Sequence, residues 1–165
     1  MNDSMWHRTI ASPVGPLRAS TDGRALVALA FDGAPVDGGT APPAPAAAVL
    51  DRAASQLAEW FAGARTTFEL PLAPRGTPFQ RAVWDALLAI PYGTTASYAD
   101  VARRVGRPAA TRAVGAANGR NPIAIVVPCH RVIGADGTLG GYAGGLARKQ
   151  ALLAHEARHA FALAP

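Results

Sequence analysis

The presence of one cysteine in 165 residues is the feature that most limits what this chain can fold into. A chain with one cysteine cannot form an internal disulfide framework, and a single thiolate is too little for a closed structural zinc site. The fold must therefore be stabilised by an apolar core, and half of the residues are hydrophobic. At this length the chain can form one large domain or two small ones. We expect neither a metal ion nor a cofactor.

The cysteine lies in residues 121–132, where an apolar run meets polar and charged residues. Residues 123–127 are all aliphatic and predict a buried strand, which Pro128 ends. A lone cysteine of an intracellular protein is more often an inert part of the core. Here a proline and a histidine flank the thiol of Cys129, and the charge of Arg131 favours a thiolate. We interpret the stretch as a strand end that presents a nucleophile to a pocket.

The first part of the chain, residues 1–74, predicts a small α/β domain. Short apolar stretches alternate with turn signals, which is typical of an antiparallel meander. A segment rich in Gly, Pro and Ala, residues 32–45, predicts a loop before a helix. The expected segments are strands at residues 7–12, 17–21 and 25–31, a helix at 49–61, and a short strand or an extended exit at 66–70.

The second part, residues 75–165, predicts a mostly helical domain, so the fold class is α+β. Thr77 and Ser97 are expected helix caps, and Gln80 completes a capping box with Thr77. Two short helices joined by a Gly-containing turn are typical of a helix-turn-helix. The expected segments are a helix from 78, helices at 98–105 and 109–118 around a turn at 106–108, and a helix at 147–161.

The second helix of this pair carries few bulky side chains, and Arg112 is its one long cation. Residues 73–165 carry eleven Lys and Arg against four Asp and Glu, a local net charge of +7, which favours a polyanionic partner. A bare helix fits a DNA groove by shape and backbone contact, and one arginine can enter a base stack. The alternative is a small-residue helix packed against its neighbour, with Arg112 in solvent.

Residues that could activate Cys129 follow it in the sequence. His130 is adjacent, so a bridging water would link its ring to the sulfur. Glu156 is the only acidic residue after Asp136 and could orient the histidine, which gives the thiol, base and carboxylate of nucleophilic catalysis. The Gly-rich residues 134–146 have no Walker pattern and suit a loop whose backbone lines a flat ligand.

Several motifs of the second part resemble the O6-alkylguanine–DNA alkyltransferase family. The Pro-Cys-His-Arg sequence at residues 128–131 is the most specific of them. The motifs cover residues 76–157, and the first part resembles the family only in layout, a ribonuclease-H-like α/β domain. The supporting runs are residues 77–80, 83–84, 90–93, 97–98, 112–115, 121–123, 141–146 and 152–156.

The resemblance implies direct reversal of alkylation damage in DNA. The cysteine would attack the alkyl carbon on O6 of a flipped-out guanine and keep the group as an irreversible thioether. O4-alkylthymine, the preferred alkyl group and the rate stay open. The resemblance implies catalytic roles for Cys129, His130, Glu156, Tyr98 and Asn121, DNA binding by Arg112, Ala113, Ala116 and Asn118, and a base pocket at Val132, Tyr142 and Ala143.

The implied partner is double-stranded DNA, bound through its minor groove with little dependence on sequence by a monomer, with cooperativity left open. No apolar run approaches about 18 residues and no secretory signal is evident, so a soluble, cytoplasmic protein is expected. Two other functions compete. A helix-turn-helix regulator would bind specific sequences without the thiol, and a cysteine hydrolase would turn over repeatedly.

Overall fold

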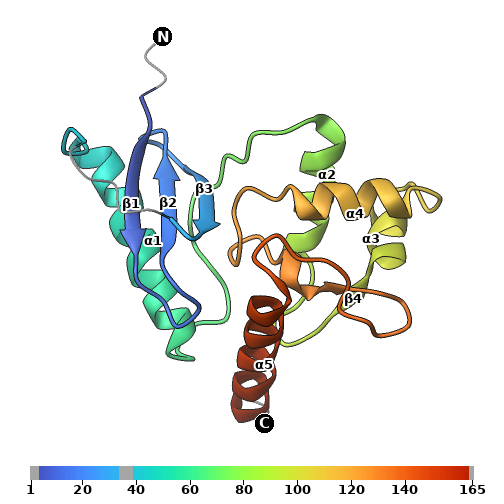
Figure 1. Cartoon of the computed structure of the whole chain (residues 1–165). Helices are drawn as coiled ribbons and strands as arrows, with labels where there is room; N and C mark the ends of the chain where they lie inside the picture. The colour runs from blue at the N-terminus through green and yellow to red at the C-terminus, as the bar shows by residue number, and fades with distance from the viewer. Residues whose placement is uncertain (1–3, 34–38, 164–165) are drawn as a thin grey trace. The chain divides into compact units, whose positions relative to one another are not determined.

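The computed structural model describes residues 4–33 and 39–163, which form two compact units, Met1–Arg75 and Gly76–Pro165 (Figure 1). Within these described residues, no helix has both the length and the apolar character needed to cross a membrane. Residues 34–38 of the predicted loop lie outside the described residues.

The first unit is the predicted antiparallel meander with one helix against it. The strands pair in the order β1-β2-β3, with Ile10 opposite Leu17 and Leu17 opposite Phe31. The helix α1 lies along the sheet (Figure 1) and packs on it through residues at helical spacing, among them Leu50 and Leu57. These elements are β1 Trp6–Ile10, β2 Leu17–Thr21, β3 Leu26–Phe31 and α1 Ala44–Phe61.

Residues 66–70 do not form a strand, so of the two predictions for this segment, a short strand or an extended exit, the first is wrong. The chain there is irregular, and its pairing with the sheet comes later, as an isolated parallel bridge between Leu72 and Leu26. The backbone of Leu26 donates to Pro71 O at 2.8 Å and accepts from Ala73 N at 2.9 Å. The pairing is limited to a single bridge, because Pro71 and Pro74 lack the N–H groups that a longer ladder needs.

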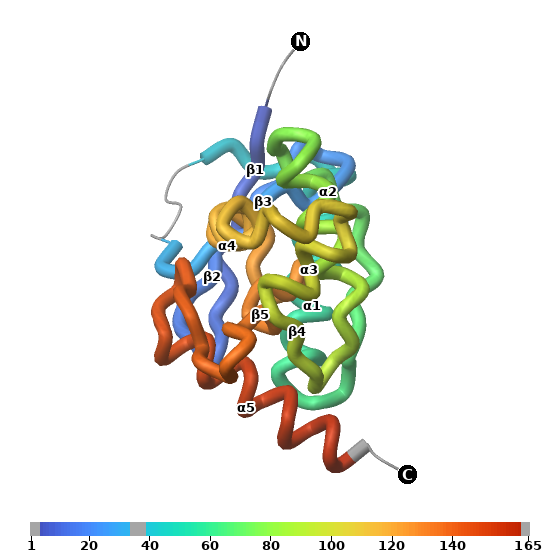
Figure 2. The backbone as a smooth tube through the Cα atoms, turned by 90° about the vertical axis from the view of Figure 1, so that its right-hand side faces the viewer, coloured from blue at the N-terminus to red at the C-terminus, as the bar shows by residue number. Residues whose placement is uncertain are grey.

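The second unit is mostly helical, as predicted. The capping boxes at Thr77 with Gln80 and at Ser97 with Asp100 are both formed, which confirms the two predicted helix starts. Figure 2 shows α2, α3 and α4 grouped together, and β4 pairs in parallel with β5. The elements are α2 Pro78–Leu88, β4 Ala96–Ser97, α3 Tyr98–Arg104, α4 Thr111–Gly119, η1 Cys129–Arg131, β5 Val132–Ile133 and α5 Leu146–Leu163.

The two predicted helix-turn-helix segments, α3 and α4, pack against each other. The connection is longer than predicted, because a turn closed by Ala110 N and Arg107 O at 2.9 Å delays the start of α4 to Thr111. Trp84 of α2 also holds α4, since its Nε1 donates to Ala117 O at 2.9 Å. The helix is therefore fixed on its inner side by its neighbours.

Residues 123–127 are buried but do not form the predicted strand. Val126 N donates to Ala124 O at 2.8 Å and Val127 N to Ile123 O at 3.0 Å, so the run folds into a compact turn. Ile125 at its centre has a φ of 69°, which is strained for a β-branched residue. The aliphatic pattern correctly indicated burial. It did not indicate a strand, because a turn whose backbone groups are hydrogen-bonded within it can also be buried.

Candidate active site

The single cysteine begins η1, directly after the buried turn, and its side chain is only 6% exposed. Its backbone N–H donates to Val127 O at 2.8 Å, and its carbonyl accepts from Val132 N. Pro128, between the turn and η1, has φ −82° and ψ 64°, which is the geometry of an inverse γ-turn. Both backbone polar groups of Cys129 are thus hydrogen-bonded, and these bonds restrain the main chain that carries the sulfur.

Asn121 holds the turn that precedes the cysteine. Its Nδ2 donates to Val127 O at 2.8 Å and to Ile123 O at 3.3 Å, and its Oδ1 accepts from Ile123 N at 3.0 Å. The side-chain amide of Asn121 therefore supplies the hydrogen bonds that a neighbouring strand would otherwise give to these buried backbone groups. Asn121 also forms a hydrogen bond with the Cys129 side chain.

His130 and Glu156 meet as the sequence predicted. His130 Nε2 lies 2.8 Å from Glu156 Oε1, and the two side chains are 0% and 1% exposed. Burial lowers the pKa of His130 despite the opposing effect of Glu156, so the imidazole is neutral near pH 7. Burial raises the pKa of Glu156, but hydrogen bonds and charges of His130 and Arg131 outweigh it and hold that pKa below its ordinary value. The pair is therefore a neutral base oriented by a carboxylate.

Arg131 shares this carboxylate, a contact that sequence reasoning missed. Its Nε donates to both oxygens of Glu156 at 2.9 and 3.0 Å, and Nη2 to Oε1 at 2.7 Å. Nη1 donates to Ile90 O at 2.7 Å, and the guanidinium lies 5.6 Å from the centre of the Tyr92 ring. The arginine is paired with Glu156, so the charge that sequence reasoning assigned to activating the Cys129 thiol serves to neutralise the carboxylate instead.

Burial raises the pKa of the Cys129 thiol. Hydrogen bonds with Asn121 and Tyr142 and the positive charge of Lys149 act in the opposite direction but are outweighed. The thiol of the free protein is therefore protonated near neutral pH. A reaction at this sulfur needs a base during the chemical step, and His130 is a neutral imidazole next to it in the chain.

Tyr98 stands between α4 and the Gly-rich loop. A Cβ added at Gly115 would lie 3.8 Å from its ring, and one added at Gly140 would lie 2.7 Å from its hydroxyl oxygen. Burial raises the pKa of Tyr98, and the Cys129 charge adds to the effect. The hydroxyl therefore keeps its proton and can donate a hydrogen bond to a ligand that enters beside it.

The three residues predicted to line a base pocket differ in burial. Val132 is fully buried in β5, Tyr142 is partly buried close to Cys129, and Ala143 is exposed. Burial also raises the pKa of Tyr142, so this hydroxyl is a second donor near the sulfur.

Lys149 is a buried cation that the sequence analysis passed over as part of an ordinary helix. Its Nζ donates to three backbone carbonyls, of Val132 at 2.6 Å, of Leu139, and of Gly141 at 3.4 Å. An ammonium has three donors and no fixed plane, so it fits three convergent carbonyls better than a guanidinium does. One signal could have found it, since Lys149 is the only lysine among 16 basic residues.

The predicted DNA-binding residues fall on opposite sides of α4. Arg112, Ala113 and Ala116 are exposed, and the helix is otherwise held on its inner side. Asn118 is 4% exposed, and its Nδ2 donates to Cys129 O at 3.3 Å. Asn118 therefore contacts the backbone of the cysteine, and its role as a groove contact stays a prediction.

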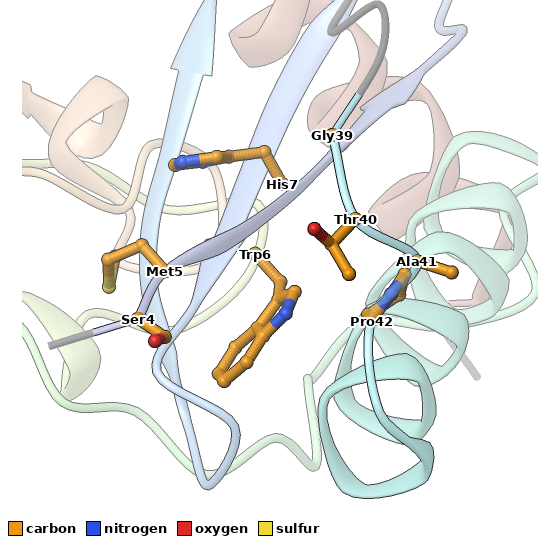
Figure 3. Close-up of a pocket in the computed structure, with 8 residues that line it drawn as sticks. All are labelled: Ser4, Met5, Trp6, His7, Gly39, Thr40, Ala41 and Pro42. Atoms are coloured by element: carbon orange, nitrogen blue, oxygen red, sulfur yellow. The ribbon is translucent and has the colours of Figure 1, made fainter. Parts of the chain in front are cut away.

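The first unit has a cavity of about 580 Å³ beside β1, with the Trp6 ring between this strand and residues 39–42 (Figure 3). The only titratable side chain that lines it is His7, whose Nδ1 lies 2.7 Å from Ser20 Oγ. Among the described residues, no group of three or more His, Cys, Asp or Glu could hold a metal ion. The reactive groups of the described chain gather in the second unit.

A buried cysteine beside a hydrogen-bonded histidine–carboxylate pair, in one unit with a helix-turn-helix, defines the class: a DNA-binding protein with a candidate reactive cysteine. The model of the 6-O-methylguanine DNA methyltransferase DNA-binding domain matches residues 78–158, and the model of the ribonuclease-like domain of the same family matches residues 5–74. The chain belongs to the 6-O-methylguanine DNA methyltransferase family, as its motifs predicted.

Relatives and solved structures agree with this assignment. The chain is 50% identical over 147 residues to the methylated-DNA–protein-cysteine methyltransferase of Mycobacterium tuberculosis, covering 89% of each chain. It is 46% identical over 154 residues to that of Methanosarcina acetivorans, covering 90% of this chain and 96% of the relative. The crystal structure of Mycobacterium tuberculosis OGT in complex with DNA superposes with a TM-score of 0.83 at 49% identity, covering 93% of each chain.

Proposed function

We propose that this chain reverses alkylation damage in DNA by moving the O6-alkyl group of guanine to Cys129. The class of reaction is that of its family, a stoichiometric methylated-DNA–protein-cysteine methyltransferase, and the acceptor is the only cysteine of the chain. The observation that supports the proposal best is the buried set of Cys129, His130 and Glu156 behind the exposed helix α4.

In the proposed reaction, the thiol proton passes to His130 through a water, and Glu156 stabilises the imidazolium that forms. The sulfur attacks the alkyl carbon, an S–C bond forms, and the C–O6 bond breaks with its electron pair going to guanine. Tyr98 donates a hydrogen bond to the departing base, which takes up a proton from solvent to become neutral guanine. His130 then releases the proton that it took from the thiol to solvent. The product thioether has no route back to a thiol, so each chain reacts once.

The substrate base has to leave the duplex before the sulfur can reach it, at a cost of a few kcal/mol. We propose that α4 lies in the minor groove, where its exposed alanines allow close approach without reading the sequence, and that Arg112 takes the place of the extruded nucleotide. One chain provides all of these groups, so the proposed active form is a monomer. The slope of a binding titration on long duplexes would measure cooperativity.

The proposal is tested by mixing the protein with a duplex that contains one O6-methylguanine and measuring its intact and peptide masses. We expect one CH2 to be gained on the peptide with Cys129, in a 1:1 ratio to protein, and none by Cys129→Ser. Repeated turnover would indicate a hydrolase. Sequence-specific binding with no mass gain would indicate a regulator, and either result would refute the proposal. Running the same assay with O4-methylthymine tests the second substrate.

Replacing the proposed intercalating side chain tests base extrusion. For Arg112→Ala we expect transfer from duplex DNA to slow about 10-fold to 100-fold, because the cost of unstacking is no longer offset, while transfer from single-stranded DNA is nearly unchanged. Arg158→Ala is the matched control, since it removes the same charge from an exposed position on α5. Equal slowing on both DNA forms would contradict the intercalating role.

A further inference from the structure

The inner face of α4 is connected to the reactive cysteine by one side chain. Asn118 lies in the last turn of α4 and is buried, on the opposite side from the exposed Arg112 and Ala116. Its Nδ2 donates to the carbonyl oxygen of Cys129 at 3.3 Å. The same carbonyl accepts from Val132 N, at the start of the strand predicted to line the base pocket. The helix, the nucleophile and the pocket strand thus converge on one oxygen.

Two further features make this contact more than packing. The Oδ1 of Asn118 is buried and has no hydrogen-bond partner among the described residues, so the amide is held here at an energetic cost. The neighbouring turn of α4 is fixed separately, because Trp84 Nε1 donates to Ala117 O at 2.9 Å. The attachment of α4 to the rest of the unit therefore does not depend on Asn118 alone. The Asn118 amide instead restrains the backbone of Cys129.

We infer that Asn118 is a positioning residue that couples the seating of α4 on DNA to the placement of the Cys129 main chain. This inference rests on the proposed function, since α4 is the proposed DNA-binding helix. A helix that is displaced by binding moves its own side chains with it, and this one is bonded to the backbone of the nucleophile. Alkyl transfer requires the sulfur to be aligned with the alkyl carbon, and a misplacement of about 1 Å can slow such a step about 100-fold.

The test compares Asn118→Leu and Asn118→Ala with the wild type in three measurements. These are the single-turnover transfer rate at saturating O6-methylguanine duplex, the affinity for the same duplex, and the rate at which iodoacetamide alkylates the only cysteine. Leucine removes the Nδ2 donor but fills the volume of the asparagine side chain. It therefore tests the lost hydrogen bond even if the cavity left by alanine destabilises the fold. We expect the transfer rate at saturation to fall about 10-fold or more, with affinity within about twofold of the wild type.

Iodoacetamide separates positioning from the repair reaction itself, because it needs the thiol but no DNA. We expect its reaction with Cys129 to become faster in both variants, since the sulfur is no longer held in place. Gln56→Ala is the matched control: it removes a buried amide that bonds the Glu69 backbone at 2.8 and 3.1 Å in the first unit. We expect it to lower the thermal midpoint without changing any of the three measurements.

Two results would overturn the inference. A loss confined to DNA affinity would make Asn118 a DNA contact, and unchanged transfer at saturation together with unchanged iodoacetamide reactivity would make it a packing residue. Failure of the proposed function is seen separately, as a wild-type protein that gains no mass from the duplex. In that case the iodoacetamide measurement still decides whether Asn118 holds the cysteine.

Discussion

The two units of this chain bury different kinds of polar side chain. In the described part of the first unit the buried polar residues are uncharged, namely Ser20, Thr21 and Gln56. In the second unit they include four ionisable residues close to the cysteine, which are His130, Arg131, Lys149 and Glu156. Burying charge costs free energy unless it is paired and hydrogen-bonded.

This difference indicates which unit couples its stability to its chemistry. Thr21 and Gln56 bond to backbone groups of the same unit, with Thr21 Oγ1 donating to Ala25 O at 2.6 Å and Gln56 Nε2 to Glu69 O at 3.1 Å. Such contacts fix local chain paths and can be replaced. His130 and Arg131 are connected through Glu156, so these three side chains depend on one another. Lys149 is held separately, by three backbone carbonyls of the same unit. We therefore expect changes in the second unit to affect stability and chemistry together, and changes in the first to affect stability alone.

The largest effect is expected for Glu156→Ala. This change leaves the Arg131 guanidinium buried without its carboxylate, which costs about 3–5 kcal/mol of unfolding free energy, and it leaves His130 without its orienting partner. Urea denaturation and the single-turnover assay measure the two effects. A variant with less than about 1 kcal/mol of destabilisation would show that Arg131 finds other partners, and the network description would fail.

Gly140→Ala is the next largest. Gly140 has a φ of +68°, and a Cβ there would lie 2.7 Å from the Tyr98 hydroxyl oxygen. We expect a loss of about 1–3 kcal/mol in stability from the strained backbone, and slower transfer because Tyr98 is displaced. Gly137→Ala is the control, since Gly137 has a φ of +85° with nothing within 4 Å of its added Cβ. Equal transfer rates for the two variants would argue against a role for the Tyr98 position.

A smaller effect is expected in the first unit from Gln56→Ala. The loss of its two hydrogen bonds to the Glu69 backbone costs about 1–2 kcal/mol, while the rate of transfer from duplex DNA stays at the wild-type level. Calorimetry and the transfer assay check the two halves of this expectation. A slower reaction would break the comparison, because it would show that the first unit also determines the chemistry.

The smallest effect near neutral pH is the pH dependence of stability. The folded pKa of His130 is lowered, so the unfolded state binds a proton first and stability falls as pH drops below about 6.5. The folded pKa of Glu156 is also lowered, so its contribution is present above about pH 4.3 and is lost as pH falls through the folded pKa. Thermal midpoints from pH 8 to 3 measure both effects. We expect Glu156→Gln to flatten the acidic part, and a parallel curve would contradict this assignment.

Much of the fold could be predicted from the sequence because the signals for it are local. The capping residues Thr77 and Ser97 act within one helical turn, so both helix starts were predicted correctly. The strand predicted at residues 123–127 was wrong, because aliphatic composition indicates burial alone. It does not indicate whether the backbone is hydrogen-bonded by the Asn121 side chain or by a neighbouring strand. The boundary of α4 shifted for a related reason, since a turn before Thr111 has no strong residue signal.

What the sequence alone determined is the set of reactive groups and the local frame that carries them. One cysteine leaves one acceptor, and Glu156 was predicted to meet His130 because it is the only acidic residue after Asp136. Only the tertiary structure decided where the remaining polar side chains point. The buried contacts of Arg131, Lys149 and Asn118 are made across 25, 17 and 11 residues of sequence, and no local propensity reports such distances. The physical reason is that burial of a charge or an amide is decided by which partners the whole fold brings within hydrogen-bond reach.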